Sequence, residues 1–397
     1  MLRLGIIFGG RSAEHEISIL SAASVSDAVD TTKYIPVHIG INKKGEWFII
    51  NDDMANLSSL NDKRIRTLIP DQTPDLCSRA DAHEKNSSLQ CRVQPLNPGS
   101  LRSHVDFALP LLHGPYGEDG KIQGLFEMLD LPYGGCGVTA SALSMDKLFA
   151  RDILIRHGLP LCRHLAVYES DYMADKQAVR NRIKNEIGCP VFIKPANMGS
   201  SVAVSKVNNV KDLDSALMKA FAFDNRVVAE EAVDAIELET AVLGNTGAIQ
   251  VQEIDTKCSK QLTHDIAVKA AAVGEIIPNA EFYDYDSKYK STRTQMIIPA
   301  QIPAHIAEQA RALAVLAYKA LNCEGFARVD FFLDRKSGNI LVNEINTIPG
   351  FTRYSMFPLL WQAVGLEYPD LIERIIGLGY ERYHAKNNRE ANHRTRQ

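Results

Sequence analysis

The chain has 397 residues, of which 45% are hydrophobic, and its formal net charge is -4. This length can bury more than one core and predicts roughly two or three domains. The near balance of acidic and basic residues excludes the global basic field that nucleic-acid-binding proteins and proteins of anionic membranes carry.

The chain begins with a predicted strand, a glycine turn and a helix. LRLGIIFGG is an apolar run that ends in Gly9 and Gly10, and the segment RSAEHEISILSAASVSDAVD then places apolar residues at helical spacing. The run is far too short for a signal peptide or a membrane span, and no later run reaches spanning length. We therefore expect an N-terminal α/β domain in a cytoplasmic protein, with no membrane or nucleic acid as partner.

Further elements follow in chain order. KYIPVHIGIN and VDFALPLLHG predict two more strands of the first sheet, and the polar residues 51–103 between them predict an irregular connection with at most a short helix. SALSMDKLFARDILIRHG predicts a helix, and CPVFIKPA and VAVSKV predict a hairpin around the loop NMGSS. Residues 304–321 and 357–377 are expected to be helical.

The seven cysteines are scattered and contain no C-x-x-C pair. An odd, dispersed set is typical of reduced thiols in a cytosolic protein rather than of a disulfide framework or a zinc site.

A hairpin near the C-terminus carries three oxygen-bearing side chains. In GFARVDFFLDRKSGNILVNEIN, a turn centred on Ser337 places Asp330 opposite Glu344, and Asn346 follows on the same face because side chains alternate along a strand. Two carboxylates this close repel each other unless a proton or a cation lies between them. The flanking segments are too apolar for a solvated strand face. The pattern therefore favours a Mg²⁺ site completed by substrate phosphate.

The segment FIKPANMGSSVAVSKV supplies a candidate phosphate loop. Lys194 provides a positive charge at a strand end, and the tip from Gly199 to Ser201 presents amides and hydroxyls to anionic oxygens. Two other glycine motifs are weaker. GIIFGGRS lacks the lysine of a P-loop, and GCGVTA lacks the acid that dinucleotide-binding folds place about 20 residues later.

The motifs also occur in a familiar order. GGRSAEHEIS, HGPYGEDG, SALSMDK, KPANMGSSV, FYDYDSKY, ARVDFFL and NEINTIPGFT follow one another as in the ATP-grasp D-alanine-D-alanine ligases, which the chain resembles from about residue 1 to 380. The resemblance implies an α/β (α+β) ATP-grasp fold with a Rossmann-like, biotin-carboxylase-like N-terminal domain. The expected parts are the substrate-binding domain 1–140, the central lid domain 141–228, the catalytic domain 229–380 and a polar, disordered tail 381–397.

The resemblance assigns amino-acid binding to several motifs. Glu14 would hold the ammonium of the first D-alanine, and His113 would line the same pocket. Without the resemblance, Glu14 would pass for an acid that complements a helix dipole. Lys288, Ser355 and Met356 would bind the second D-alanine.

The resemblance also assigns nucleotide and metal contacts. The residues expected to contact ATP are Lys147, Lys194, Ser200, Ser201, Glu230, Val233 and Glu237. Among them the lysines would reach the phosphates, Glu230 the adenine edge and Glu237 the ribose, although Glu231 or Glu239 in the same acidic segment could be mistaken for them. Asp330, Glu344 and Asn346 would bind Mg²⁺, with two ions bridged by Glu344 and with Mn²⁺ as a substitute.

The implied chemistry is peptide-bond formation through an acyl phosphate. The carboxylate of the first D-alanine attacks the γ-phosphate, and the amine of the second attacks the acyl carbon. Arg328 and the Gly350 amide would stabilise the oxyanion. FYDYDSKYK would be a mobile loop in which Tyr289 joins Glu14 and Ser200 in a triad that holds the closed state, and a tyrosine here favours an amine acceptor.

Three departures and three alternatives accompany this prediction. Ala203 replaces the usual glycine, residues 245–275 read as a surface insertion, and Arg353 and Tyr354 replace smaller residues. The alternatives are a relative that uses D-lactate or D-serine, a non-catalytic nucleotide-binding protein, and a dinucleotide oxidoreductase. We expect a homodimer with D-alanine and ATP as substrates.

Overall fold

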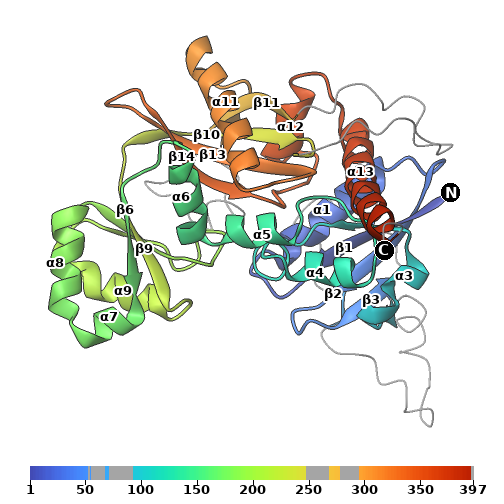
Figure 1. Cartoon of the computed structure of the whole chain (residues 1–397), viewed down its shortest axis with the longest axis horizontal. Helices are drawn as coiled ribbons and strands as arrows, with labels where there is room; N and C mark the ends of the chain where they lie inside the picture. The colour runs from blue at the N-terminus through green and yellow to red at the C-terminus, as the bar shows by residue number, and fades with distance from the viewer. Residues whose placement is uncertain (52–53, 55–67, 71–92, 247–267, 278–294, 395–397) are drawn as a thin grey trace, which may run out of the picture.

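The computed structural model describes residues 1–51, 54, 68–70, 93–246, 268–277 and 295–394. The described strands form three sheets, which lie in three lobes (Figure 1). No helix in this part of the chain is both long and apolar enough to cross a membrane.

The N-terminal sheet is built around a buried central strand. Its order is β4-β3-β2-β1-β5, and β1 is parallel to both β2 and β5. Because β1 is covered on both faces, it reads as a continuous apolar run rather than an alternating one. The strands are β1 (Leu2–Gly9), β2 (Tyr34–Ile41), β3 (Trp47–Ile50), β4 (Val93–Pro95) and β5 (Phe107–Pro110). The helices are α1 (His15–Ala28), η2 (Pro98–Ser100), α3 (Leu101–His104), α4 (Lys121–Met128) and α5 (Val138–Met145).

The turn after β1 brings Glu14 to the carboxyl edge of this sheet. Gly9 and Gly10 both have φ of +90°, and a Cβ on Gly9 would lie 2.3 Å from the Ile41 carbonyl oxygen. Only glycine fits such a position. The chain therefore turns sharply into α1, with Glu14 at the helix start and above the strand ends.

The central sheet has the order β6-β9-β7-β8 and is antiparallel. One face packs on α8 and α9 through an apolar cluster that includes Ile183 and Leu217. The other face carries Ala196 and Val228, which pack against Leu148 of α6. The elements are α6 (Lys147–Arg156), β6 (His164–Tyr168), α7 (Glu169–Ala174), α8 (Lys176–Glu186), β7 (Val191–Pro195), β8 (Ser205–Val207), η3 (Val210–Asp212), α9 (Leu213–Phe221) and β9 (Arg226–Glu231). The expected domain boundary after residue 228 falls inside β9.

The C-terminal sheet has the order β12-β11-β10-β13-β14 and is antiparallel. Val329 and Phe331 of β13 face α11, so the alternate residues Arg328 and Asp330 face the other side, as strand periodicity requires. The elements are β10 (Ala235–Leu243), β11 (Lys269–Ile277), β12 (Gln295–Ile297), α11 (Ala304–Ala320), β13 (Phe326–Asp334), β14 (Ile340–Asn346) and α12 (Met356–Gln362).

The disordered tail expected at 381–397 is wrong for most of its length. Helix α13 (Tyr368–Arg394) runs through it and lies beside the N-terminal lobe (Figure 1). The polar residues have partners there. The Arg382 guanidinium lies 4.1 Å from the centre of the Tyr133 ring and donates to the Tyr133 carbonyl at 3.0 Å, and Lys386 pairs with Glu127. The helix expected at 357–377 is divided between α12 and α13.

The surface insertion expected at 245–275 is also wrong in part. Its last residues belong to β11, which is paired on both sides, by β10 and β12. Asn245 is buried and accepts from the Gly325 amide at 3.0 Å. Residues 247–267 and most of 51–92 lie outside the described residues.

Close packing of α13 predicts an unusual response to alanine. A Cβ on Gly379 would lie 2.5 Å from the Tyr133 carbonyl oxygen and 2.6 Å from Phe107, so Gly379→Ala should lower the free energy of unfolding by about 1–3 kcal/mol. Gly124→Ala in α4 meets nothing within 4 Å and should instead raise it by up to about 1 kcal/mol. Chemical denaturation of both variants measures the contrast. An increase for Gly379→Ala would mean that α13 does not dock on the N-terminal lobe.

Candidate active site

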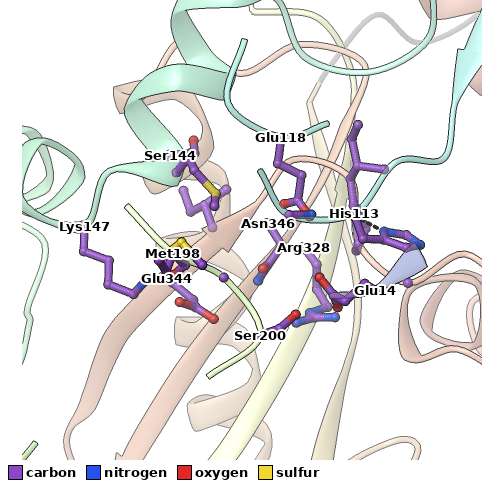
Figure 2. Close-up of a pocket in the computed structure, with 17 residues that line it drawn as sticks. Glu14, His113, Glu118, Ser144, Lys147, Met198, Ser200, Arg328, Glu344 and Asn346 are labelled. Carbon is purple, nitrogen blue, oxygen red and sulfur yellow. Dashed lines mark hydrogen bonds between the residues drawn. The ribbon is translucent and has the colours of Figure 1, made fainter. Parts of the chain in front are cut away.

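A pocket lies where groups from all three lobes meet (Figure 2). Glu14, His113 and Glu118 come from the N-terminal lobe, and the C-terminal strands supply a floor of charged and amide side chains. Of the residues predicted from sequence, those that line this one pocket are Glu14, His113, Lys147, Ser200, Arg328, Glu344, Asn346 and Gly350.

The predicted hairpin register is confirmed at the pocket end. Asp330 lies opposite Glu344, and Arg328 lies opposite Asn346. A bulge follows between Asp330 and Phe331, and Phe331 lies opposite Val342. Because a bulge places an extra residue in one strand, the register predicted from a turn centred on Ser337 is wrong by one residue on the turn side.

Asp330 and Arg328 form a tight ion pair at the base of the pocket. Arg328 Nε lies 2.6 Å from Asp330 Oδ1, and Nη2 lies 2.7 Å from Oδ2. Asn346 Nδ2 also donates to Asp330 Oδ2 at 2.9 Å. Arg328 Nε lies 3.0 Å from Glu239 Oε2 on the neighbouring strand β10. The guanidinium is thus held between two carboxylates.

These carboxylates keep Arg328 charged. Burial opposes the charge, but the negative charges of Asp330 and Glu239 outweigh it and hold the pKa of Arg328 well above its ordinary value. The pocket therefore contains a permanent cation beside Glu14 and Ser200 (Figure 2).

His113 joins the N-terminal lobe to the loop after β14. Its Nδ1 lies 2.9 Å from the Ile348 carbonyl oxygen, and its Nε2 lies 3.2 Å from the Ser21 hydroxyl. Burial lowers the pKa of His113, so the ring is neutral near pH 7. Because a carbonyl only accepts, Nδ1 carries the proton and Nε2 accepts from Ser21.

Glu118 faces the same pocket. The Gly114 amide donates to its Oε1 at 3.0 Å. Burial, and then the negative charge of Glu14, raise the pKa of Glu118 to about 8. This carboxyl is therefore largely protonated at neutral pH and can donate a hydrogen bond.

The predicted phosphate loop closes the pocket from the central lobe. Lys147 is the first residue of α6, and its Nζ donates to the Met198 carbonyl at 2.5 Å. Ser200, Ser201 and Ala203 have φ of 55°, 56° and 57°. This left-handed conformation favours glycine, which gives a physical reason for the glycine usual at position 203.

The donor set at the hairpin suits a hard cation. Among the described residues no group of three His, Cys, Asp or Glu side chains could enclose a metal. An ion near Asp330 and Glu344 would therefore need the Asn346 oxygen and ligands from a substrate. Shared coordination with phosphate is the arrangement that Mg²⁺ prefers.

Family models match both halves of the chain. The model for the D-ala D-ala ligase N-terminus covers residues 3–136, and that for the D-ala D-ala ligase C-terminus covers 153–269 and 259–377. A D-alanine--D-alanine ligase of Halothermothrix orenii is 40% identical over 96% of this chain and 98% of its own length. That of Acetivibrio thermocellus is 39% identical over 96% of both.

The chain belongs to the D-alanine-D-alanine ligase family. Solved ligases of this family agree in fold. The D-alanine-D-alanine ligase from Coxiella burnetii is 30% identical, with a TM-score of 0.77 over 100% of this chain and 99% of its own. The VanG D-Ala:D-Ser ligase from Enterococcus faecalis is 31% identical, with a TM-score of 0.74 over 95% of this chain and 99% of its own. The expected ATP-grasp fold is confirmed.

Other residues predicted from the ligase motifs lie beside the pocket or elsewhere. Lys194 and Glu230 pair with each other at 2.6 Å. Val233 lies in the link between β9 and β10, and Glu237 lies in β10. Ser201 follows Ser200 in the loop. Lys288 and Tyr289 fall outside the described residues.

The two residues predicted after Gly350 are placed differently from each other. Ser355 lies close to Gly350, and its hydroxyl lies 2.7 Å from that of Thr352. The Met356 side chain packs in the core under Gly274, so only its main chain is left for a ligand of this ligase fold.

The sequence does not single out three charged residues at or near this site. Glu118 stands in the ligase motif HGPYGEDG, where it is the only glutamate. Glu239 is one of several neighbouring acids, and strand pairing places it opposite Asp330. Arg151 of α6 pairs with Glu230 outside the pocket lining and carries no sequence signal beyond a cation in a helix.

The raised pKa of Glu118 predicts how pH changes stability. Between about pH 4.5 and 8 the folded chain keeps this proton and the unfolded chain releases it, so this group makes stability fall as pH rises. Glu118→Gln removes the effect. The melting temperature of the variant minus that of the wild type, both measured without metal, should increase from pH 5 to pH 8. A constant difference over this range would mean that Glu118 ionises as an ordinary surface acid.

Proposed function

We propose that the protein joins two D-alanines to D-alanyl-D-alanine with conversion of ATP to ADP and phosphate, as a step in peptidoglycan precursor synthesis. The observation that carries this proposal is the convergence of groups from all three lobes on one pocket, which is lined by Glu14, Ser200, Arg328, Glu344 and Asn346. Asp330 lies behind this lining and is bonded to Arg328 and Asn346. An anionic recognition group, a phosphate loop, a fixed cation and a metal-compatible hairpin are the parts that carboxylate activation needs.

The first step forms an acyl phosphate. Glu14 binds the ammonium of the first D-alanine, while neutral His113 and protonated Glu118 add no charge that would repel either end of the amino acid. A carboxylate oxygen of the substrate forms a bond to the γ-phosphorus, and the bond from that phosphorus to ADP breaks. Lys147 and Lys194 neutralise the charge that spreads over the phosphate oxygens.

The second step forms the peptide bond. The neutral amine of the second D-alanine attacks the acyl carbon, and the oxyanion is stabilised by Arg328 and by the Gly350 amide. Phosphate then leaves with the electrons of the carbon–oxygen bond, and the nitrogen of the new amide gives up its extra proton to the departing phosphate. A Cβ on Gly350 would lie 3.3 Å from Ser355 Oγ, so glycine keeps this backbone open to the substrate.

Mg²⁺ would be held by Asp330, Glu344 and Asn346. When bound, the ion neutralises phosphate charge during phosphoryl transfer, and Mn²⁺ is expected to substitute. In the protein alone, both Asp330 oxygens are occupied by Arg328 and one also by Asn346. Asp330 must release part of this pairing to bind the ion, and Glu239 can then retain Arg328 in the pocket. We expect two ions, a homodimer and a cytoplasmic location.

D-serine is a second candidate for the acceptor. It is favoured by the similarity to the VanG D-Ala:D-Ser ligase, which is 31% identical. Tyr354, in the segment after Gly350, is 68% exposed.

Phosphate release tests the proposed reaction. With ATP, Mg²⁺ and D-alanine alone, we expect steady phosphate release and formation of D-alanyl-D-alanine. Added D-lactate should leave the product unchanged, because the expected acceptor is an amine, whereas mixed dipeptide from added D-serine would identify the second candidate. No turnover with D-alanine under any of these conditions would overturn the proposal.

Asp330→Asn tests the proposed metal hairpin. Loss of one negative charge should reduce kcat about a hundredfold or more and raise the Mg²⁺ concentration needed for half-maximal rate. Asp334→Asn is the matched control, because Asp334 ends the same strand in the exposed turn with Ser337. Both variants should keep the circular dichroism of the wild type. Equal activity of Asp330→Asn and Asp334→Asn would mean that the metal lies elsewhere.

A further inference from the structure

A buried cluster of charges lies on the face of the central sheet that packs against α6. Arg151 of α6 pairs through Nη2 with Oε2 of Glu230 on β9. Lys194 of β7 lies with its Nζ 2.6 Å from the other oxygen, Oε1. The Arg151 and Glu230 side chains are only 3% and 1% exposed, and Lys194 is 12% exposed. Glu230 therefore divides its carboxylate between two cations.

Both cations help to keep Glu230 ionised in this position. Burial alone would raise its pKa, but Arg151 and Lys194 lower the pKa of Glu230 to about 2. The surroundings are otherwise positive. Burial lowers the pKa of Lys147, and the charges of Lys194 and Arg151 lower it further against the opposing effect of Glu344. Such an excess of cations suits a polyanion.

Phosphate binding by Lys194 creates a conflict within this cluster. An ammonium that moves to a phosphate oxygen leaves Glu230 Oε1, and a buried carboxylate without a cation is strongly unfavourable. Arg151 is the other cation paired with Glu230 within the part of the chain that the structure describes. It can keep the carboxylate ionised when Lys194 departs.

We propose that Arg151 is a positioning residue for the nucleotide: it holds the Glu230 carboxylate so that Lys194 can exchange Glu230 for the phosphates of ATP. The proposal rests on the proposed function in assigning Lys194 to the phosphates. It gives Arg151 a role that acts through Glu230 and Lys194 and not through contact with the reacting atoms.

The hydrogen bonding of Arg151 supports this role over one in stability alone. Within the described chain its Nε and Nη1 have no hydrogen-bond partner, although the residue is buried. A buried guanidinium with unsatisfied donors weakens the fold relative to an apolar residue of similar size. A charged residue at position 151 is therefore better explained by the need of Glu230 for a second cation than by a contribution to stability.

The test measures nucleotide binding by the full-length chain without any amino acid. The probe is a non-hydrolysable ATP analogue with Mg²⁺, titrated calorimetrically, and KM values for ATP and D-alanine are measured beside it. In Arg151→Met, Lys194 is the one cation still paired with Glu230 among the described residues, so the Kd of the analogue and the KM for ATP should rise about tenfold or more. The KM for D-alanine should stay within about twofold, because its site is elsewhere.

A double-mutant cycle separates this role from a structural one. Glu230→Gln alone removes the buried anion, and with it the charge expected at the adenine edge, so it provides its own reference Kd. Arg151→Met added to Glu230→Gln should then change the Kd by less than about threefold, because no buried carboxylate is left that needs a second cation. Arg151→Lys, which keeps the charge, should lie between the wild type and Arg151→Met. Arg156→Met, which removes an exposed cation from the same helix, is the matched control and should bind the analogue as the wild type does.

Two results would overturn the proposal. One is unchanged analogue binding by folded Arg151→Met, and the other is a tenfold or larger rise in Kd when Arg151→Met is added to Glu230→Gln without a change in melting temperature. If Arg151→Met does not fold alone, the comparison between Glu230→Gln and the double variant decides. Since these titrations contain no amino acid, failure to turn over D-alanine would remove the proposed function without altering their outcome.

Discussion

The pairing of Arg328 with Asp330 and Glu239 is the constraint on which the active site depends. A buried guanidinium persists only with anionic partners, and here two carboxylates from adjacent strands supply them. Strand register decides which residues these are, because Glu239 lies opposite Asp330 between β10 and β13. The alternate residues of β13, Val329 and Phe331, then face α11. One ionic cluster thus determines which face of the sheet is apolar core and which is the pocket floor.

Each lobe contributes only part of the pocket. His113 reaches from the N-terminal lobe to the Ile348 carbonyl after β14, and Lys147 reaches from α6 to Met198 in the loop of the central lobe. The residues that line the pocket come from all three lobes, so no single lobe contains the site. Such an arrangement suits a reaction in which an amino acid, a nucleotide and a second amino acid approach from different sides.

The protonation states in the pocket match ligands of mixed charge. His113 and Glu118 are shifted toward their neutral forms by burial, whereas Arg328 and Glu230 are kept ionised by partners of opposite charge. A zwitterion needs one fixed charge for each end and little else nearby, while a polyanion needs an excess of cations. The pocket between Glu14 of the N-terminal lobe and Arg328 of β13 provides the first environment, and the face of the central sheet beside α6 provides the second.

The sequence by itself determined the features that follow from short-range periodicity and ordered motifs. Alternation along a hairpin placed Asp330, Glu344 and Asn346 on one face, and the motifs from Glu14 to Gly350 identified the family. Only the tertiary structure decided the rest. The polar residues of α13 looked disordered because Tyr133 and Glu127, their partners, are far away in the chain. β11 looked like part of an insertion because a long stretch of chain separates it from β10, the strand with which it pairs. Arg151 and Glu118 acquire their roles from burial and from neighbouring charges, and those exist only once distant segments have packed together.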